Sequence, residues 1–385
     1  MIRFMYRKTS LILAAIGVCL AQPQITHRPP GTPTGRPLRG LTSQQLALFE
    51  AGKEDFEDLE EKADGLGPAF NGISCHSCHN IPTTGGVGNI SVLRAGRQEN
   101  GVFSVPQGGS LIHLFATEPR CQPRIPSDAN ILARRIPTPL FGLGLVEAIP
   151  DETLRRLEGV TGGRAALVIE PGTRNQRVGR FGWKAQLATL LAFAGDAYIN
   201  EMGITNDIFP SEVGTGLSPQ QLAECDPIPG NEDPIDPATG RRGIDNLSNF
   251  MRLLAPLNLR PPQRGAGAEV FAATGCASCH IPTLMTGPNP IAALDRQPVH
   301  GFSDFLLHDI GTGDGIEQGA ARGNEFRTAP LWGMSSRKML MHDGRALTPA
   351  EAIDAHAGQA RESRDNFRRM GQAERKAFLD YLSTL

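Results

Sequence analysis

The sequence has no excess of charge of either sign. Its 385 residues include 38 Lys and Arg against 40 Asp and Glu, for a formal net charge of -2. A protein that binds nucleic acid through a broad basic surface would need a marked surplus of Lys and Arg. The composition excludes that class, while 40% hydrophobic residues are enough for a packed core.

Hydrophobic runs long enough to cross a bilayer are also missing. The run Leu11–Ala21 has 11 residues, whereas a transmembrane helix needs about 20. It follows the basic stretch Met1–Lys8 and precedes a possible cleavage point before Gln22. We therefore expect residues 1–21 to be a signal peptide, and the mature protein to be periplasmic with no stable membrane span. A buried N-terminal helix is the alternative.

Aromatic residues are scarce, at 6%, and the seven cysteines are unevenly spread. Four cysteines fall in two C-x-x-C-H motifs, the attachment signal for c-type haem. In this signal two thiols add to the haem vinyl groups, and the histidine that follows binds the iron. The predicted cofactor residues are Cys75, Cys78 and His79 in the first motif and Cys276, Cys279 and His280 in the second. We expect two covalently bound c-type haems.

Two other uses of the motif cysteines fit less well. A four-cysteine zinc ribbon would separate its two pairs by about 15–20 residues, far less than the distance between these motifs. A thiol redox pair does not need the histidine that follows each motif. Of the remaining cysteines, Cys19 lies in the predicted signal peptide. Cys121 and Cys225 can form a disulfide in an oxidising compartment, or remain two separate thiols.

The patterning around the motifs predicts a mainly α protein with two cytochrome c-like haem domains and long loops. The predicted domains are residues 40–255, with insertions, and residues 263–385. Predicted helices cover Thr42–Glu61, Arg264–Thr274 and Gln372–Leu385. Asp226–Arg242 is rich in Pro and Asp and predicts a long loop, and Pro256–Pro262 predicts a linker.

Several longer segments resemble the di-haem oxidoreductase family. They include GLGPAFNGISCHSCH, RRIPTPLFGLGLVEAIPDETL, GRFGWKAQLATL, NEMGITN and a long block from FSDFLLHDIGTGDG to MHDGRALTPAEAIDAHAG. Together they span about residues 40 to 385. This family is related to bacterial di-haem cytochrome c peroxidases and to the di-haem enzyme that matures methylamine dehydrogenase.

The resemblance implies two catalytic residues. Trp183, in GRFGWKA, corresponds to a tryptophan that lies between the haems, and the only other tryptophan is Trp332. Glu201, in the pair Glu201-Met202, corresponds to a carboxylate near the peroxidatic iron, where it can move a proton between the peroxide oxygens. A plain core tryptophan and a solvated carboxylate are the alternatives. Glu147 is a second carboxylate candidate.

The resemblance also implies iron ligands. In the peroxidases a His-x-Gly segment is followed 14 residues later by an axial Met, and here His342-Asp343-Gly344 is followed 14 residues later by His356. We expect His280 and His356 to bind the C-terminal iron, with His342 as the competing ligand. Because Met ligation raises the potential, a bis-His haem should be low-spin and of lower potential. His308 is expected to be structural or near a propionate.

For the N-terminal iron, His79 is the expected proximal ligand. The nearby candidate for the sixth position is His113, but an open, high-spin haem is the preferred expectation. The related peroxidases hold calcium with an Asn where this sequence has Arg135, so calcium is not expected.

The function expected from these features is peroxide reduction. Peroxide, or another small oxidant, would react at the N-terminal haem with help from Glu201. Electrons would pass from a reducing partner, a protein or a small molecule, through the C-terminal haem and Trp183. The alternatives are a di-haem electron-transfer cytochrome with no chemistry of its own, and an oxidase of a thiol or protein substrate.

Overall fold

The computed structural model describes residues 35–385, except 227 and 258–261. The predicted signal peptide and most of the predicted linker lie outside the described residues. The helices are α1 (Ser43–Glu57), α2 (Leu143–Glu147), α3 (Asp151–Thr161), α4 (Leu190–Ala197), α5 (Pro219–Cys225), α6 (Gly243–Leu253), α7 (Ala266–Ala273), α8 (Pro349–Asp354), α9 (Arg361–Arg369) and α10 (Gln372–Leu382).

Short strands alternate with these helices. They are β1 (Ala69–Phe70), β2 (Val92–Glu99), β3 (Val102–Ser104), β4 (Leu111–Ile112), β5 (Phe115–Ala116), β6 (Ile131–Arg135), β7 (Ala166–Ile169), β8 (Gln176–Gly179), β9 (Leu284–Met285), β10 (Pro298–Val299), β11 (Leu307–His308) and β12 (Phe326–Arg327). They pair into five small sheets among the described residues.

The prediction of a mainly α fold is therefore wrong. Many of the strands contain two residues, too few to produce the alternation of apolar and polar residues that identifies a strand in a sequence. The longest, β2, is the centre of the largest sheet and pairs with β3, β4 and β6. It carries Arg94 and Arg97 within its span, so its pattern does not look like that of a core strand.

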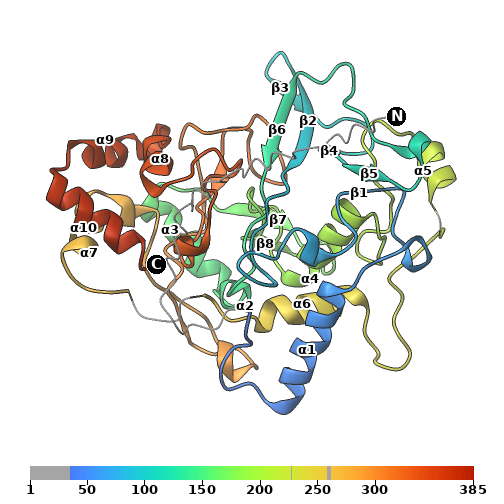
Figure 1. Ribbon diagram of the computed structural model, residues 1–385, viewed down its shortest axis with the longest axis horizontal. Helices are drawn as coiled ribbons and strands as arrows, with labels where there is room; N and C mark the ends of the chain where they lie inside the picture. The colour runs from blue at the N-terminus through green and yellow to red at the C-terminus, as the bar shows by residue number, and fades with distance from the viewer. Residues whose placement is uncertain (1–34, 227, 258–261) are drawn as a thin grey trace, which may run out of the picture.

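The first helix forms as predicted and packs on a helix distant in the sequence. Thr42 caps α1 by accepting a hydrogen bond from the Gln45 backbone N–H at 3.2 Å, and the Gln45 side-chain oxygen accepts one from the Thr42 N–H at 3.0 Å. α1 then crosses α6 (Figure 1). Gly52 permits the close approach, since a Cβ there would lie 2.1 Å from the backbone oxygen of Asn246.

The C-terminal motif is supported by a second helix pair. α7 and α10 pack together, with the rings of Phe271 and Phe378 stacked at 6.0 Å. Both helices fall where the sequence predicts them. With α8 and α9 they gather at one end of the molecule, on the side away from α1, α6 and the β2–β6 sheet (Figure 1).

The hydrophobic core has a larger and a smaller part. The larger one extends from Leu38 to Trp332 and so includes residues from both predicted domains. The smaller one lies among α7, α9 and α10 and contains Phe271, Phe367 and Phe378. The domain boundary expected between residues 255 and 263 remains a prediction from the sequence.

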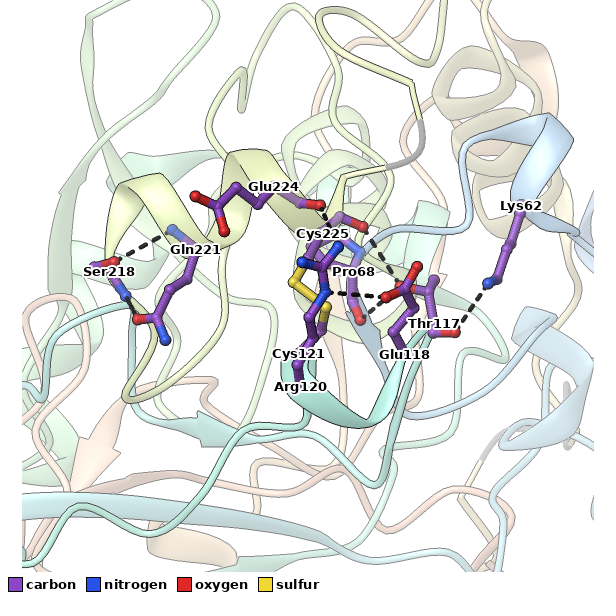
Figure 2. The surroundings of a disulfide bond; sticks show 10 residues. All are labelled: Lys62, Pro68, Thr117, Glu118, Arg120, Cys121, Ser218, Gln221, Glu224 and Cys225. Carbon is purple, nitrogen blue, oxygen red and sulfur yellow. Dashed lines mark hydrogen bonds and ion pairs between the residues drawn. A yellow bond between two sulfur atoms is a disulfide. The ribbon is translucent and has the colours of Figure 1, made fainter.

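A disulfide links two distant segments in the N-terminal part of the chain. Cys121 and Cys225 are bonded, with their Cα atoms 5.9 Å apart and a sequence separation of 104 (Figure 2). Arg120 donates to the backbone oxygen of Glu224, and the Thr117 hydroxyl donates to that of Cys225 (Figure 2). Of the two possibilities left open by the sequence, the disulfide is the one found.

Candidate functional site

The N-terminal C-x-x-C-H motif begins with a tight turn. Ser74 caps the 3-10 turn Cys75–Ser77, its hydroxyl accepting from the Ser77 N–H at 3.1 Å. The His79 Nδ1 lies 2.8 Å from the backbone oxygen of Gly86. Because a carbonyl can only accept, Nδ1 carries the proton and Nε2 keeps a free lone pair. Burial lowers the pKa of His79 to about 4, so the ring is neutral, as a metal ligand must be.

The C-terminal motif repeats this arrangement. The 3-10 turn Cys276–Ser278 follows α7, and the His280 Nδ1 lies 2.9 Å from the backbone oxygen of Phe302. Nε2 is again the nitrogen left for a metal. Burial lowers the pKa of His280 to about 4 as well.

The motif thiols differ from those of a redox pair. Burial raises the pKa of Cys75 and Cys276 to about 12 and that of Cys78 to about 11. Reactive dithiols have lowered pKa values, since the thiolate is the nucleophile. The surroundings of these cysteines therefore favour a structural or attachment role over thiol redox chemistry.

Each motif opens into a large cavity. The N-terminal cavity, lined by Cys75, Cys78 and His79, has a volume of about 1190 Å³. The C-terminal cavity, lined by Cys276, Cys279 and His280, has a volume of about 1510 Å³. These volumes include the solvent space at the mouth of each cavity.

Carboxylates project into the N-terminal cavity. Glu201 lies in the π-helical turn Tyr198–Met202, and its Oε2 accepts a hydrogen bond of 2.7 Å from the Asn71 side chain. Burial raises its pKa, against the effect of that hydrogen bond. Asp196, at the end of α4, is a second acid in the same wall, and burial raises its pKa to about 6. Asp196 was not predicted from the sequence, because it belongs to no recognisable motif.

Histidines distinguish the C-terminal cavity. Its wall contains His308, His342 and His356 besides His280. The His356 Nδ1 lies 2.7 Å from the backbone oxygen of Ala352, which leaves Nε2 as the metal-binding nitrogen, as in the two motif histidines. Burial lowers the pKa of His356.

The other two histidines have different neighbours. His342 stacks on Phe326, with ring centroids 4.1 Å apart and planes 21° apart. His308 lies 2.8 Å from Asp304 and 3.8 Å from the Cys279 sulfur. Both nitrogens of His308 therefore have partners already, while His342 remains the competing ligand for the iron.

Trp183 belongs to the walls of both cavities, as do its neighbours Ile136 and Pro137. Its indole Nε1–H donates to the backbone oxygen of Ile136 at 2.8 Å. Trp183 therefore lies between the two motif cavities, and its role between two haems remains a prediction.

Two arginines of the N-terminal cavity wall have a buried nitrogen atom without a hydrogen-bond partner in the part of the chain that the structure describes. The Nε atom of Arg94 and the Nη2 atom of Arg135 are buried and have no hydrogen-bond partner among the described residues. Both arginines line the N-terminal cavity. Unpaired buried donors are rare in folded proteins, so an anionic group such as a haem propionate fits here.

The wall of the C-terminal cavity also contains two arginines, Arg327 and Arg337. Arg327 and Arg337 hydrogen-bond to backbone carbonyls, and no carboxylate within the described ranges pairs with either. Burial lowers the pKa of both to about 10, for Arg327 together with the neighbouring Arg337 charge. Propionates would supply the missing negative charge. Neither arginine was found from the sequence, because their role depends on what surrounds them.

Two residues weighed in the sequence analysis are not in a cavity wall. His113 is absent from the lining of the N-terminal cavity, and its Nε2 lies 2.8 Å from the backbone oxygen of Asn200. Glu147 accepts from Arg252 at 2.7 Å and from the Leu190 N–H at 2.7 Å, at the start of α4. Neither residue therefore lines a motif cavity.

The sequence model of a protein family described as "Di-haem oxidoreductase, putative peroxidase" matches residues 120–385. The chain belongs to this family. It is therefore an oxidoreductase, and membership implies two haem groups. The match includes the second motif, Trp183 and Glu201, and begins after the first motif.

Several solved structures are similar to this chain. One is hydrazine synthase of Kuenenia stuttgartiensis, at 15% identity and a TM-score of 0.41, covering 98% of this chain and 100% of that one. Another is a MauG-like protein associated with microbial copper homeostasis, at 17% and 0.41, covering 93% and 91%. A third is a variant of the di-haem peroxidase BthA of Burkholderia thailandensis, at 15% and 0.37, covering 91% and 88%.

Among curated protein sequences, none matches this chain. Within the part of the chain that the structure describes, no helix combines the length and hydrophobicity needed to cross a membrane.

Proposed function

We propose that this protein is an exported di-haem peroxidase of the c type, which reduces peroxide at its N-terminal haem with electrons relayed through a bis-His C-terminal haem. The observation that carries this proposal is the unequal distribution of histidine. Among the described residues, the N-terminal cavity wall has one histidine, His79, whereas the C-terminal wall has four.

Covalent attachment is supported by both motifs. In each, a 3-10 turn places two cysteines and a histidine in one cavity wall, with the histidine Nδ1 bonded to a carbonyl. The Cys121–Cys225 disulfide supports export, since structural disulfides persist in oxidising compartments. The segment expected to be the signal peptide is consistent with this location.

A bound iron atom would have different coordination at the two sites. His280 and His356 would occupy both axial positions of the C-terminal iron, leaving it to transfer electrons. His79 would bind the N-terminal iron on one side, and no second histidine within the described part of the wall competes with a small oxidant. The haem there supplies the electrons and the Lewis acidity that peroxide cleavage requires.

Glu201 is suited to proton transfer at this site. Its carboxylate lies in the cavity wall and is oriented by Asn71. Peroxide reduction needs a proton to leave one oxygen and arrive at the other. A buried carboxyl with a raised pKa holds and releases a proton nearer to neutral pH than an exposed one does.

Trp183 is suited to connect the two haems. Its ring contributes to both walls and is fixed by its hydrogen bond to Ile136. A reducing partner, a protein or a small molecule, would supply electrons at the C-terminal haem.

Absorption and electron paramagnetic resonance spectra test the proposal. The ferric protein should contain one high-spin and one low-spin haem, and peroxide should change the spectrum of the high-spin one. If both haems are low-spin, and peroxide changes neither spectrum in the resting or the half-reduced state, the protein would instead be an electron-transfer cytochrome. Alkaline pyridine spectra of the denatured protein would show whether both haems are attached through thioethers.

A further inference from the structure

A buried histidine contacts a cysteine of the C-terminal motif. The Nδ1 atom of His308 lies 3.8 Å from the sulfur of Cys279. On the other side of the ring, Nε2 lies 2.8 Å from the Oδ2 atom of Asp304. The side chains of His308 and Asp304 are 3% and 0% exposed. In the described part of the chain, none of the other motif sulfurs has a side-chain hydrogen-bond partner.

The backbone around Asp304 is built to hold this contact. Asp304 N–H donates to the backbone oxygen of Cys279 at 2.9 Å, and Phe302 accepts the hydrogen bond of His280. Phe302 and Phe305 have φ angles of 52° and 57°, a left-handed conformation that is unfavourable for such residues. Strained backbone persists where the surroundings enforce it, often at functional sites.

A neighbouring segment also leaves space for the histidine. At Gly163 a Cβ atom would lie 2.5 Å from the His308 Nε2 atom. Any other residue there would push the imidazole away from Asp304 or from Cys279. Three separate segments therefore converge on one ring.

The two acceptors determine the protonation of the ring. Asp304 accepts at Nε2, and a thioether sulfur has no hydrogen to give, so Nδ1 must carry one to bond it. An imidazole that donates from both nitrogens is an imidazolium. Despite burial, the hydrogen bond to Asp304 raises the pKa of His308, and the same hydrogen bond lowers the pKa of Asp304 despite its own burial.

We propose that His308, held by Asp304, is a positioning residue that donates a hydrogen bond to the thioether sulfur of Cys279 and raises the reduction potential of the C-terminal haem. The inference rests on the proposed covalent attachment at this cysteine. The His308 imidazolium lies nearer the Cys279 sulfur than the Asp304 carboxylate does. The positive charge therefore has the larger effect at the haem, and it stabilises the reduced state. It would offset part of the low potential expected for bis-His ligation.

The test uses the holoprotein and a double variant, Asp304→Asn with His308→Leu. This pair of substitutions removes the donor without leaving an unpaired buried carboxylate. In a spectroelectrochemical titration the midpoint potential of the C-terminal haem should fall, while that of the N-terminal haem stays at its wild-type value. In a second variant, Asp304→Asn with His308→Gln, the amide N–H should restore part of the potential.

An unchanged C-terminal potential in the double variant, with both haems attached, would overturn the inference. If the double variant loses haem, resonance Raman spectra of the wild-type holoprotein decide. An N–H···S bond should shift one set of C–S stretching bands between H₂O and D₂O, and identical bands in the two solvents would also overturn it. Absence of thioethers from the wild-type protein would refute the proposed attachment itself, which the pyridine spectra detect separately.

Discussion

The indole of Trp183 and the imidazole of His342 lie edge to face, with ring centroids 6.3 Å apart and planes at 77°. Phe326 completes the group, stacked on His342 and 6.4 Å from Trp183. The ammonium of Lys184 lies 4.1 Å from the Phe326 centroid. Trp183 thus packs in an aromatic cluster on one side while it lines the two cavities, and the hydrogen bond to Ile136 helps to fix its orientation.

Replacing Trp183 by Phe should slow electron transfer between the haems. The smaller ring loses the hydrogen bond to Ile136 and part of the surface shared by both cavities. We expect the half-reduced protein to react with peroxide at least about tenfold more slowly, equivalent to about 1.4 kcal/mol in the barrier. Stopped-flow absorption measures this rate.

Trp332→Phe is the matched control, because Trp332 is the other tryptophan of the sequence and lies in the wall of neither motif cavity. This control should react at the wild-type rate. Equal rates in the two variants would show that no particular tryptophan connects the haems.

Residues whose chemistry is local could be predicted from the sequence. The two C-x-x-C-H motifs and the helices α1, α7 and α10 lie where the patterns put them. A C-x-x-C-H motif is defined by its spacing alone, and a helix cap such as Thr42 is recognisable from the few residues that follow it. Trp183 and His356 were found through resemblance rather than through physics, and the structure places both in the expected cavity walls.

Residues whose role depends on distant neighbours could not be predicted. Arg94 and Arg327 look like ordinary surface arginines in the sequence, and only the fold shows that each lines a cavity. The sheets were missed because two-residue strands such as β11 and β12 have no measurable period. Those two strands nevertheless position His308, Phe326 and Arg327 together.

Replacing His356 by Ala should convert the C-terminal haem from low-spin to high-spin. Removing one axial imidazole leaves His280 as a single strong-field ligand. Electron paramagnetic resonance of the ferric variant should show two high-spin signals in place of one. His342→Ala is the companion variant, and should leave the low-spin signal in place. The reverse result, with His342→Ala high-spin and His356→Ala unchanged, would assign the ligand to His342.

Replacing Glu201 by Gln should slow the reaction with peroxide by about 100-fold, a common contribution of a positioned acid–base group. The amide keeps the size of the side chain but cannot accept a proton. In the wild-type protein the rate should fall as the pH drops through the raised pKa of Glu201, because only the ionised carboxylate accepts. The variant should lose this dependence, while haem content and the exposed control Glu224→Gln remain as in the wild type.

Removing the disulfide should lower stability without removing the haems. Cys225, the last residue of α5, is linked to Cys121, the last residue of a 3-10 turn 104 residues earlier, and neither cysteine lines a motif cavity. Replacing both by Ser should reduce the free energy of unfolding by about 2–5 kcal/mol. Denaturant titration followed by circular dichroism measures the change. A variant as stable as the oxidised wild type would show that the bond contributes no stability.

Stability should also fall as the pH rises above neutrality. Burial raises the pKa of Glu212 to about 8 and that of Glu232 to about 7, and neither carboxylate oxygen of Glu212 has a hydrogen-bond partner within the described residues. A raised pKa means that the folded state binds the proton more tightly than the unfolded state. The stabilisation is therefore complete below the ordinary carboxyl pKa, near 4.5, and is lost as the pH rises through 7 to 8.

Glu212→Gln isolates this effect, because the amide is neutral at every pH. At pH 8 the variant should be more stable than the wild type by about 1–2 kcal/mol, and its stability should depend less on pH between 5 and 8. Denaturation curves at several pH values, in buffer with a chelator to remove divalent cations, measure both quantities. Glu224→Gln, at an exposed position, should reproduce the wild-type curve. If Glu212→Gln also follows the wild-type curve, ionisation of the Glu212 carboxyl does not lower the free energy of unfolding.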